Sequence, residues 1–135
     1  MVIIDTGPIV AFFDESEPSH EICKSTLKKI KVPLLTSWPV LTESFYLLGD
    51  WRKGQSELWG FIIAGGLNVY DIPSSDFGRL RDLMEKYSDK PMDLADATLV
   101  LIAEIHKIKT VFTLDRDDFY LYRPKHFTHF NIIPG

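Results

Sequence analysis

Short apolar segments alternate with longer amphipathic segments along this chain, and this alternation restricts the fold more than any other feature. Runs of three to six mainly apolar residues are typical of strands in a parallel sheet, which helices cover on both faces. Five segments have this pattern: 2–4, 33–36, 67–72, 110–114 and 131–133.

The segments between these strands have helical patterns. The predicted helices span residues 8–13, 19–31, 37–48, 57–64, 74–87 and 92–107, with a loop at 49–54. Ser37 is expected to cap its helix, with Pro39 in the first turn. The centre of the helix at 92–107 is apolar nearly all round, which predicts deep burial. The sequence therefore predicts one α/β domain over residues 1–135, a three-layer α/β/α sandwich with a mainly parallel sheet of about five strands.

Bulk properties narrow the class of protein further. A net charge of −4 is unusual for a nucleic-acid-binding protein, but a bound metal ion would neutralise acids gathered in one site. The single cysteine, Cys23, has no internal partner for a disulfide, which favours a reducing cytoplasm. The sequence has neither a signal-peptide pattern nor an apolar run of about 20 residues, so we expect an unprocessed soluble protein with no membrane partner.

Four acidic residues occupy positions where a carboxylate is costly to desolvate. Asp5 and Asp115 each end an apolar run, while Glu43 and Asp96 lie in apolar helical segments. Parallel α/β sheets bind ligands at the carboxyl ends of their strands. A carboxylate beside apolar residues is expensive unless a cation lies nearby. The four acids therefore predict a divalent-metal site that folding assembles from the whole chain.

Such a site suits the hydrolysis of phosphodiesters. Two Mg²⁺ or Mn²⁺ ions about 4 Å apart stabilise charge on the attacking and leaving oxygens, and one lowers the pKa of a bound water. These hard ions take oxygen ligands, whereas zinc takes histidine and cysteine, and the chain has no spaced set of those two residues.

Several residues near these acids can be interpreted in two ways. Asp93 lies three residues before Asp96 on the same helical face, so it either binds metal or caps the helix. Asp117 and Asp118 either bind metal through water or cap the next turn. The hydroxyls of Thr6 and Thr113 either orient a carboxylate or water, or are structural.

Four segments together resemble the PIN-domain family, in the same order and with similar spacing. They are residues 4–8 (Ile-Asp-Thr-Gly-Pro), 41–43 (Leu-Thr-Glu), 92–97 (Met-Asp-Leu-Ala-Asp-Ala) and 113–119 (Thr-Leu-Asp-Arg-Asp-Asp-Phe). Within that family the chain is most similar to the VapC-type toxins of toxin–antitoxin pairs. The resemblance matches Asp5, Glu43, Asp96 and Asp115 to the family's acidic quartet and Asp93 and Asp118 to its accessory acids.

The resemblance implies an activity and partners that the residues alone do not. It implies a Mg²⁺- or Mn²⁺-dependent endoribonuclease acting on structured RNA such as tRNA or rRNA. It also implies a homodimer and a small antitoxin whose C-terminal segment fills the site. From the residues alone, the interpretation stops at a metal-dependent phosphoester or phosphodiester enzyme.

Two surfaces are candidates for contacts with these partners. An apolar stretch at 51–63, with Trp51, Leu58, Trp59, Phe61, Ile62 and Ile63, is a candidate dimer or antitoxin interface. Tyr120 and Tyr122 are candidates for stacking on bases. Basic residues for phosphate contact are Arg52, Lys53, Arg116, Arg123, Lys125 and His126.

Other functions fit the sequence less well. A receiver domain needs an acidic pair after its first strand, where Asp5 stands alone, and a phosphoacceptor after its third, where Asp71 is followed by Ile72 and Pro73. A haloacid-dehalogenase-like phosphatase needs a second aspartate two residues after the first, at the position of Gly7. A PIN-like domain that only binds RNA or acts as a scaffold would not require four buried carboxylates.

Overall fold

The computed structural model describes residues 1–49 and 52–135, and its centre is one five-stranded sheet. The strands are β1 (Val2–Ile4), β2 (Leu34–Ser37), β3 (Asn68–Tyr70), β4 (Thr110–Phe112) and β5 (Asn131–Ile133). They are ordered β3-β2-β1-β4-β5, and every neighbouring pair is parallel. The five predicted strands are confirmed, although several are shorter than the apolar runs that indicated them.

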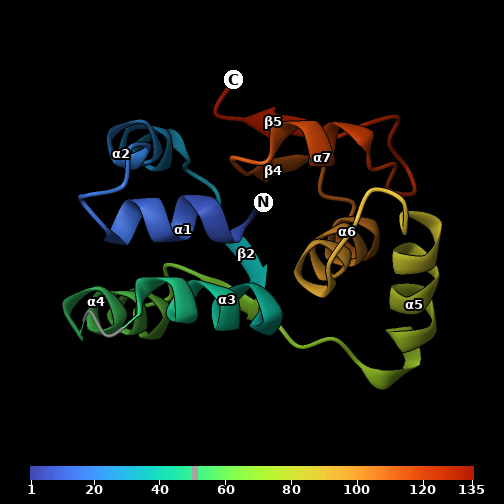
Figure 1. Ribbon diagram of the computed structural model, residues 1–135, viewed down its shortest axis with the longest axis horizontal. Helices are drawn as coiled ribbons and strands as arrows, with labels where there is room; N and C mark the ends of the chain where they lie inside the picture. The colour runs from blue at the N-terminus through green and yellow to red at the C-terminus, as the bar shows by residue number, and fades with distance from the viewer. Residues whose placement is uncertain (50–51) are drawn as a thin grey trace.

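Helices cover both faces of this sheet. They are α1 (Thr6–Phe13), α2 (His20–Lys29), α3 (Trp38–Leu48), α4 (Arg52–Ile63), α5 (Phe77–Lys86), α6 (Leu94–His106) and α7 (Arg116–Leu121), with a 3₁₀ turn at Ser74–Asp76. Figure 1 shows α1 to α4 on one side of the strands and α5 and α6 on the other. The predicted α/β/α sandwich is confirmed.

The core lies between the central strands and the helices that cover them. All three residues of β1 are buried, as expected for the middle strand of a parallel sheet. In α6 every residue from Ala97 to Glu104 is buried, which confirms the predicted burial of this helix. The sheet and α6 thus form a rigid frame for the segments that follow β1 and β4.

Capping residues set where two helices begin. Ser37 accepts a hydrogen bond from the backbone N–H of Val40, with Pro39 in the first turn, so the predicted cap of α3 is confirmed. Helix α1 begins at Thr6, two residues earlier than predicted, because the carboxylate of Asp5 accepts a hydrogen bond from the Thr6 N–H.

The structure differs from the predictions in three places. The predicted loop at 49–54 includes the start of α4, while its residues 50 and 51 lie outside the described part. Helix α7 was not predicted, since its six residues form less than two turns and show no clear periodicity. Leu58, expected in a surface patch, is fully buried, whereas Trp59 and Ile63 of that patch are exposed and Trp51 lies outside the described residues.

None of the helices in the described residues has the length and apolar character that a membrane crossing requires.

Candidate active site

The pairing of the strands brings the first and last predicted acids to the same edge of the sheet. β1 and β4 are neighbours, with Ile4 opposite Phe112, so Asp5 and Asp115 follow two adjacent strand ends. Gly7 allows a close approach here, because a Cβ at this position would lie 3.3 Å from the Cβ of Leu114. The turn that carries Asp115 therefore packs directly on the start of α1.

Asp5 is held by two hydrogen bonds, one to each carboxylate oxygen. Its Oδ1 accepts from the backbone N–H of Thr6, and its Oδ2 accepts from the Thr113 hydroxyl, both at 2.8 Å. The Thr113 oxygen in turn accepts from the backbone N–H of Asp115 at 3.0 Å. Thr113 therefore orients a carboxylate, which is one of the two roles considered for it from the sequence. The Thr6 hydroxyl instead faces the Val40 carbonyl at 3.5 Å.

Asp96 lies in the first turn of α6, and hydrogen bonds with Asp93 and Tyr122 hold it. Its backbone N–H donates to Oδ1 of Asp93, which confirms Asp93 as the cap of this helix. Its side-chain Oδ2 accepts from the Tyr122 hydroxyl at 2.8 Å. Tyr122 is fully buried, so its predicted role in base stacking is wrong. No sequence pattern indicates this contact, because Tyr122 follows α7 and is distant from Asp96 along the chain.

The ionisation of the buried Asp5 and of the partly buried Asp96 is perturbed by the same causes. Burial raises the pKa of Asp5 to about 6, and repulsion from Asp115 and Glu43 adds to this, against the opposing hydrogen bonds from Thr6 and Thr113. Burial also raises the pKa of Asp96 to about 8, with repulsion from Asp5, Asp93 and Asp115, although the hydrogen bond from Tyr122 acts in the opposite direction. The two carboxylates thus lie in a common field of negative charge.

The remaining predicted acids belong to the same cluster. Glu43 lies half-buried on α3, and Asp115 precedes α7 at an exposed position. Partial burial raises the pKa of Asp115, with repulsion from Asp118, Glu43 and Asp93. These repulsions link all six predicted ligands at one edge of the sheet, and Asp117 lines the same hollow as Asp115 and Asp118.

The donor set fits a hard divalent cation. None of the six acids forms an ion pair with a lysine, arginine or histidine in the described residues, so nothing there balances their charge. Carboxylate oxygens are the ligands that Mg²⁺ and Mn²⁺ prefer. In residues 1–49 and 52–135, no three acidic, histidine or cysteine side chains already form a metal-binding group. Side-chain rotation and water ligands would therefore have to complete the coordination of an ion.

Two of the residues predicted to contact phosphate already form hydrogen bonds within the chain. The guanidinium of Arg116 donates to the Pro134 carbonyl, and that of Arg123 donates to the carbonyls of Tyr120 and Tyr122. Tyr120 is exposed and remains a candidate for stacking. Lys53, Lys125 and His126 are exposed as well, so their contacts with RNA stay predictions, as does that of Arg52.

The fold and the site together define a class of protein: an α/β/α domain with an acidic centre at the carboxyl ends of its strands. Residues 2–124 match the model of the PIN domain, and the chain belongs to the PIN-domain family. The resemblance stated from the four sequence segments is confirmed by this match.

Individual relatives agree with this assignment. The chain is 28% identical to Ribonuclease VapC26 of Mycobacterium tuberculosis over 135 residues, which cover 98% of this chain and all of that protein. Its fold is similar to that of the Mycobacterium tuberculosis sarcin–ricin loop cleaving toxin VapC20, with a TM-score of 0.79, 15% identity and 87% and 92% of the two chains covered. A toxin–antitoxin complex from Klebsiella pneumoniae gives a TM-score of 0.68 at 18% identity, with 88% and 90% of the chains covered.

Proposed function

We propose that this protein is a metal-dependent endoribonuclease and the toxin of a VapBC-type toxin–antitoxin pair. The observation that carries the proposal is the cluster of six acids without a cationic partner in the described residues, two of them with strongly raised pKa values. The near full-length similarity to a protein named as a VapC ribonuclease supports RNA as the substrate, with tRNA or rRNA as the candidates.

The chain's own residues would prepare the site for Mg²⁺ or Mn²⁺. Asp5, Glu43, Asp96 and Asp115 would hold the metal, with Asp93 and Asp118 as accessory ligands. When bound, the metal would neutralise these carboxylates and stabilise the charge that develops on the phosphodiester oxygens.

Two hydroxyl groups keep the central acids in place. Thr113 holds one oxygen of Asp5, and Tyr122 holds one oxygen of Asp96. Each bond fixes the rotation of a carboxylate and favours its ionised form. The second Asp96 side-chain oxygen forms no hydrogen bond with the described residues, so it is the atom best suited to face a metal ion.

The partners of the proposed toxin follow from the same assignment. We propose a homodimer and a small antitoxin that blocks the acidic centre, acting in the cytoplasm. Similarity to the toxin–antitoxin complex from Klebsiella pneumoniae supports the antitoxin. The exposed Trp59 and Ile63 on α4 remain candidates for such an interface.

The direct test is cleavage of total RNA by the wild type and by Asp96→Asn. We expect the wild type to give discrete fragments with Mg²⁺ or Mn²⁺, and to give none with EDTA or with the variant. Equal cleavage by both proteins would assign the activity to a contaminant or another site. RNA binding by a wild type that cleaves no RNA would favour the alternative, a PIN-like binding or scaffolding module.

A further inference from the structure

A groove begins at the acidic centre, and most of its lining has no part in the function described so far. It consists of two hollows of about 440 and 640 Å³. Both hollows are lined by Trp38, Pro39 and Leu94, so they are two halves of one groove. Helix α3 forms one wall, and the first turn of α6 faces it.

One half of the groove belongs to the acidic centre. Glu43 and Asp93 line it, together with Trp38 and Tyr46. Trp38, Thr42 and Tyr46 are spaced four residues apart on α3 and therefore share one helical face. The two aromatic residues are 47% and 81% exposed, so their rings are available to a ligand.

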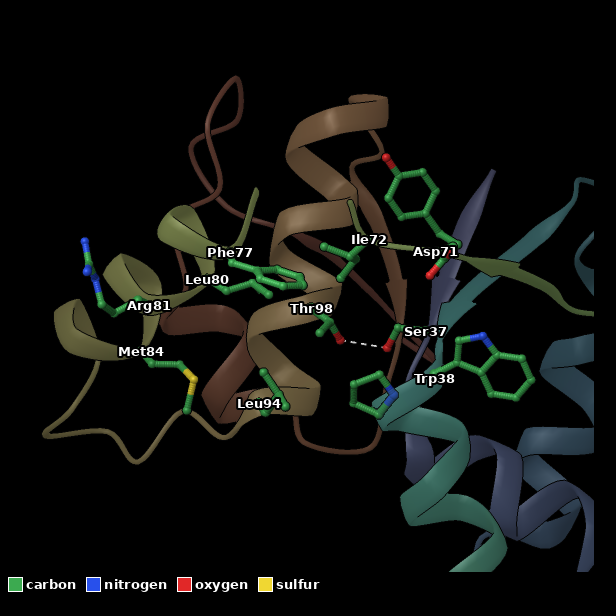
Figure 2. A pocket seen from close by; sticks show the side chains of 12 residues that line it. Ser37, Trp38, Asp71, Ile72, Phe77, Leu80, Arg81, Met84, Leu94 and Thr98 are labelled. Carbon is green, nitrogen blue, oxygen red and sulfur yellow. Dashed lines mark hydrogen bonds between the residues drawn. The ribbon is translucent and has the colours of Figure 1, made fainter. Parts of the chain in front are cut away.

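The other half of the groove is mainly apolar, although Asp71 and Arg81 also line it. Figure 2 shows Phe77, Leu80 and Leu94 gathered on one side of it, with Trp38 at the opposite edge. The hydroxyls of Ser37 and Thr98 lie between them and bond to each other at 2.7 Å. Because these two hydroxyls satisfy each other, this half presents an apolar surface to a ligand.

We propose that this groove binds an unpaired base of the RNA substrate, next to the phosphodiester that is cleaved, with the indole of Trp38 as the stacking surface. The inference rests on the proposed function and names the form of RNA that the site accepts. Bases of single-stranded loops are splayed out and stack on aromatic side chains, whereas bases within a duplex cannot reach such a surface.

Position and charge favour a base over other occupants. A phosphodiester at Glu43 and Asp93 has its attached nucleoside within the same groove, which leads directly to Trp38. A base is the uncharged part of a nucleotide, so its binding adds no repulsion with the acids. A protein segment covering the whole groove would also cover Glu43 and Asp93, as an inhibiting antitoxin would, so in the active toxin the groove is open to a base.

Trp59 provides a matched control. It is 46% exposed, almost the same as Trp38, but it lies on α4 and packs against Phe45 with ring centroids 4.9 Å apart. It does not line either half of the groove. It is a candidate for contact with a protein partner and not with RNA, so replacing it removes an indole of similar exposure away from the acidic centre and controls for RNA binding alone.

The experiment measures binding of a short unstructured oligoribonucleotide that carries 2-aminopurine, with Ca²⁺ in place of a catalytic metal. Base stacking on an aromatic residue contributes about 1–3 kcal/mol, so Trp38→Leu should weaken binding about 5- to 150-fold and abolish the quenching of 2-aminopurine. Trp38→Phe should retain most of the RNA affinity and most of the quenching. Trp59→Leu should bind RNA as the wild type does. A duplex of the same sequence should bind more weakly than the single strand.

Cleavage assays and molecular mass separate the possible failures. A wild type that cleaves RNA while Trp38→Leu binds and cleaves equally well overturns the base site and leaves the proposed ribonuclease intact. A Trp38→Leu variant with altered oligomeric mass and unaltered RNA binding also overturns it, since the groove is then an interface between copies of the chain. A wild type that neither binds nor cleaves any RNA overturns the proposed function, and the base site with it.

Discussion

Two buried carboxylates in this molecule have opposite surroundings. Glu104 on α6 is 7% exposed and accepts hydrogen bonds from Arg79 at 2.8 and 3.0 Å and from the backbone N–H of Lys125 at 2.9 Å. Asp5, at the end of β1, is 3% exposed and has no cationic partner in the described residues. Burial alone would raise the pKa of both, but Arg79 and the Lys125 N–H lower that of Glu104, whereas that of Asp5 rises to about 6.

The difference separates a buried charge that is balanced within the chain from one that is not. The Arg79–Glu104 pair joins α5 to α6 and the loop after α7, and it is complete within the chain. The carboxylates of the acidic centre repel one another and form no ion pair with a cationic side chain of the described residues, which fits the proposed metal site. Burial of a carboxylate is thus no sign of function by itself; burial without a balancing charge is.

The largest effect should come from neutralising an acid of the centre. Asp5→Asn or Asp96→Asn should reduce RNA cleavage by about 10³-fold or more, because each removes a proposed metal ligand. Each variant should be as stable as the wild type or more stable without metal, since repulsion falls. Cleavage rates and urea unfolding measure the two effects. Full activity in either variant with metal present would remove that residue from the site.

Neutralising Glu104 should have the reverse effect, with a loss of stability and unchanged cleavage. Glu104→Gln leaves the partly buried Arg79 without its countercharge, so it should lower the free energy of unfolding by about 2 kcal/mol. Cleavage per folded molecule should stay unchanged, because Glu104 is not among the charges that perturb Asp5, Asp96 or Asp115. Urea unfolding measures the free energy of unfolding, and the cleavage rate divided by the folded fraction measures the activity per folded molecule. A variant that is stable but inactive would contradict the division into two kinds of charge.

A smaller effect should follow from removing the hydroxyl that holds Asp96. Tyr122→Phe should weaken Mn²⁺ binding, measured by calorimetry, by about 10-fold, because Asp96 loses both its orientation and a bond that favours ionisation. Tyr87→Phe is the matched control, since Tyr87 packs on Tyr122 but its hydroxyl accepts from the backbone N–H of Arg123. It should lower stability while Mn²⁺ affinity is unchanged. Equal Mn²⁺ affinities in both variants would limit Tyr122 to a structural role.

The same contrast explains what the sequence could predict. Asp5 and Glu43 were identifiable because local apolar patterns placed them at a strand end and on a helix. The parallel order of the strands then brought the acids to one edge, as general rules for α/β sheets require. The fold and the acidic cluster were thus accessible from local patterns and one topological rule.

Contacts between distant segments were not accessible in this way. Tyr122 lies 26 positions from Asp96, and Arg79 lies 25 positions from Glu104. Each pair meets only because of the path of a loop or the packing of two helices, and neither has a periodic pattern. Tyr122 was therefore assigned to the surface, and the pair of Trp38 with the start of α6 was not recognised as a groove.

The smallest predicted effect is a dependence of stability on pH in the absence of metal. The pKa values of Asp5 and Asp96 are raised in the folded protein, to about 6 and about 8, so the folded state binds more protons than the unfolded state above about pH 4. Stability should therefore fall as pH rises, first through the pKa of Asp5 and then through that of Asp96. Glu104 adds little slope above about pH 5, because its lowered pKa keeps it ionised in the folded protein and an unfolded glutamate is then mostly ionised as well.

Urea unfolding in EDTA at about pH 5 and about pH 8 measures this slope. We expect the wild type to lose about 1–2 kcal/mol over this interval, after allowance for the partial exposure of Asp96. Asp96→Asn should lose less, and Glu104→Gln, although less stable throughout, should keep the wild-type slope. Since all three proteins contain the same four histidines, the differences between their slopes report the acidic residues. Identical slopes in the wild type and Asp96→Asn would show that Asp96 ionises as an ordinary surface carboxylate, and the contrast with Glu104 would then rest on Asp5 alone.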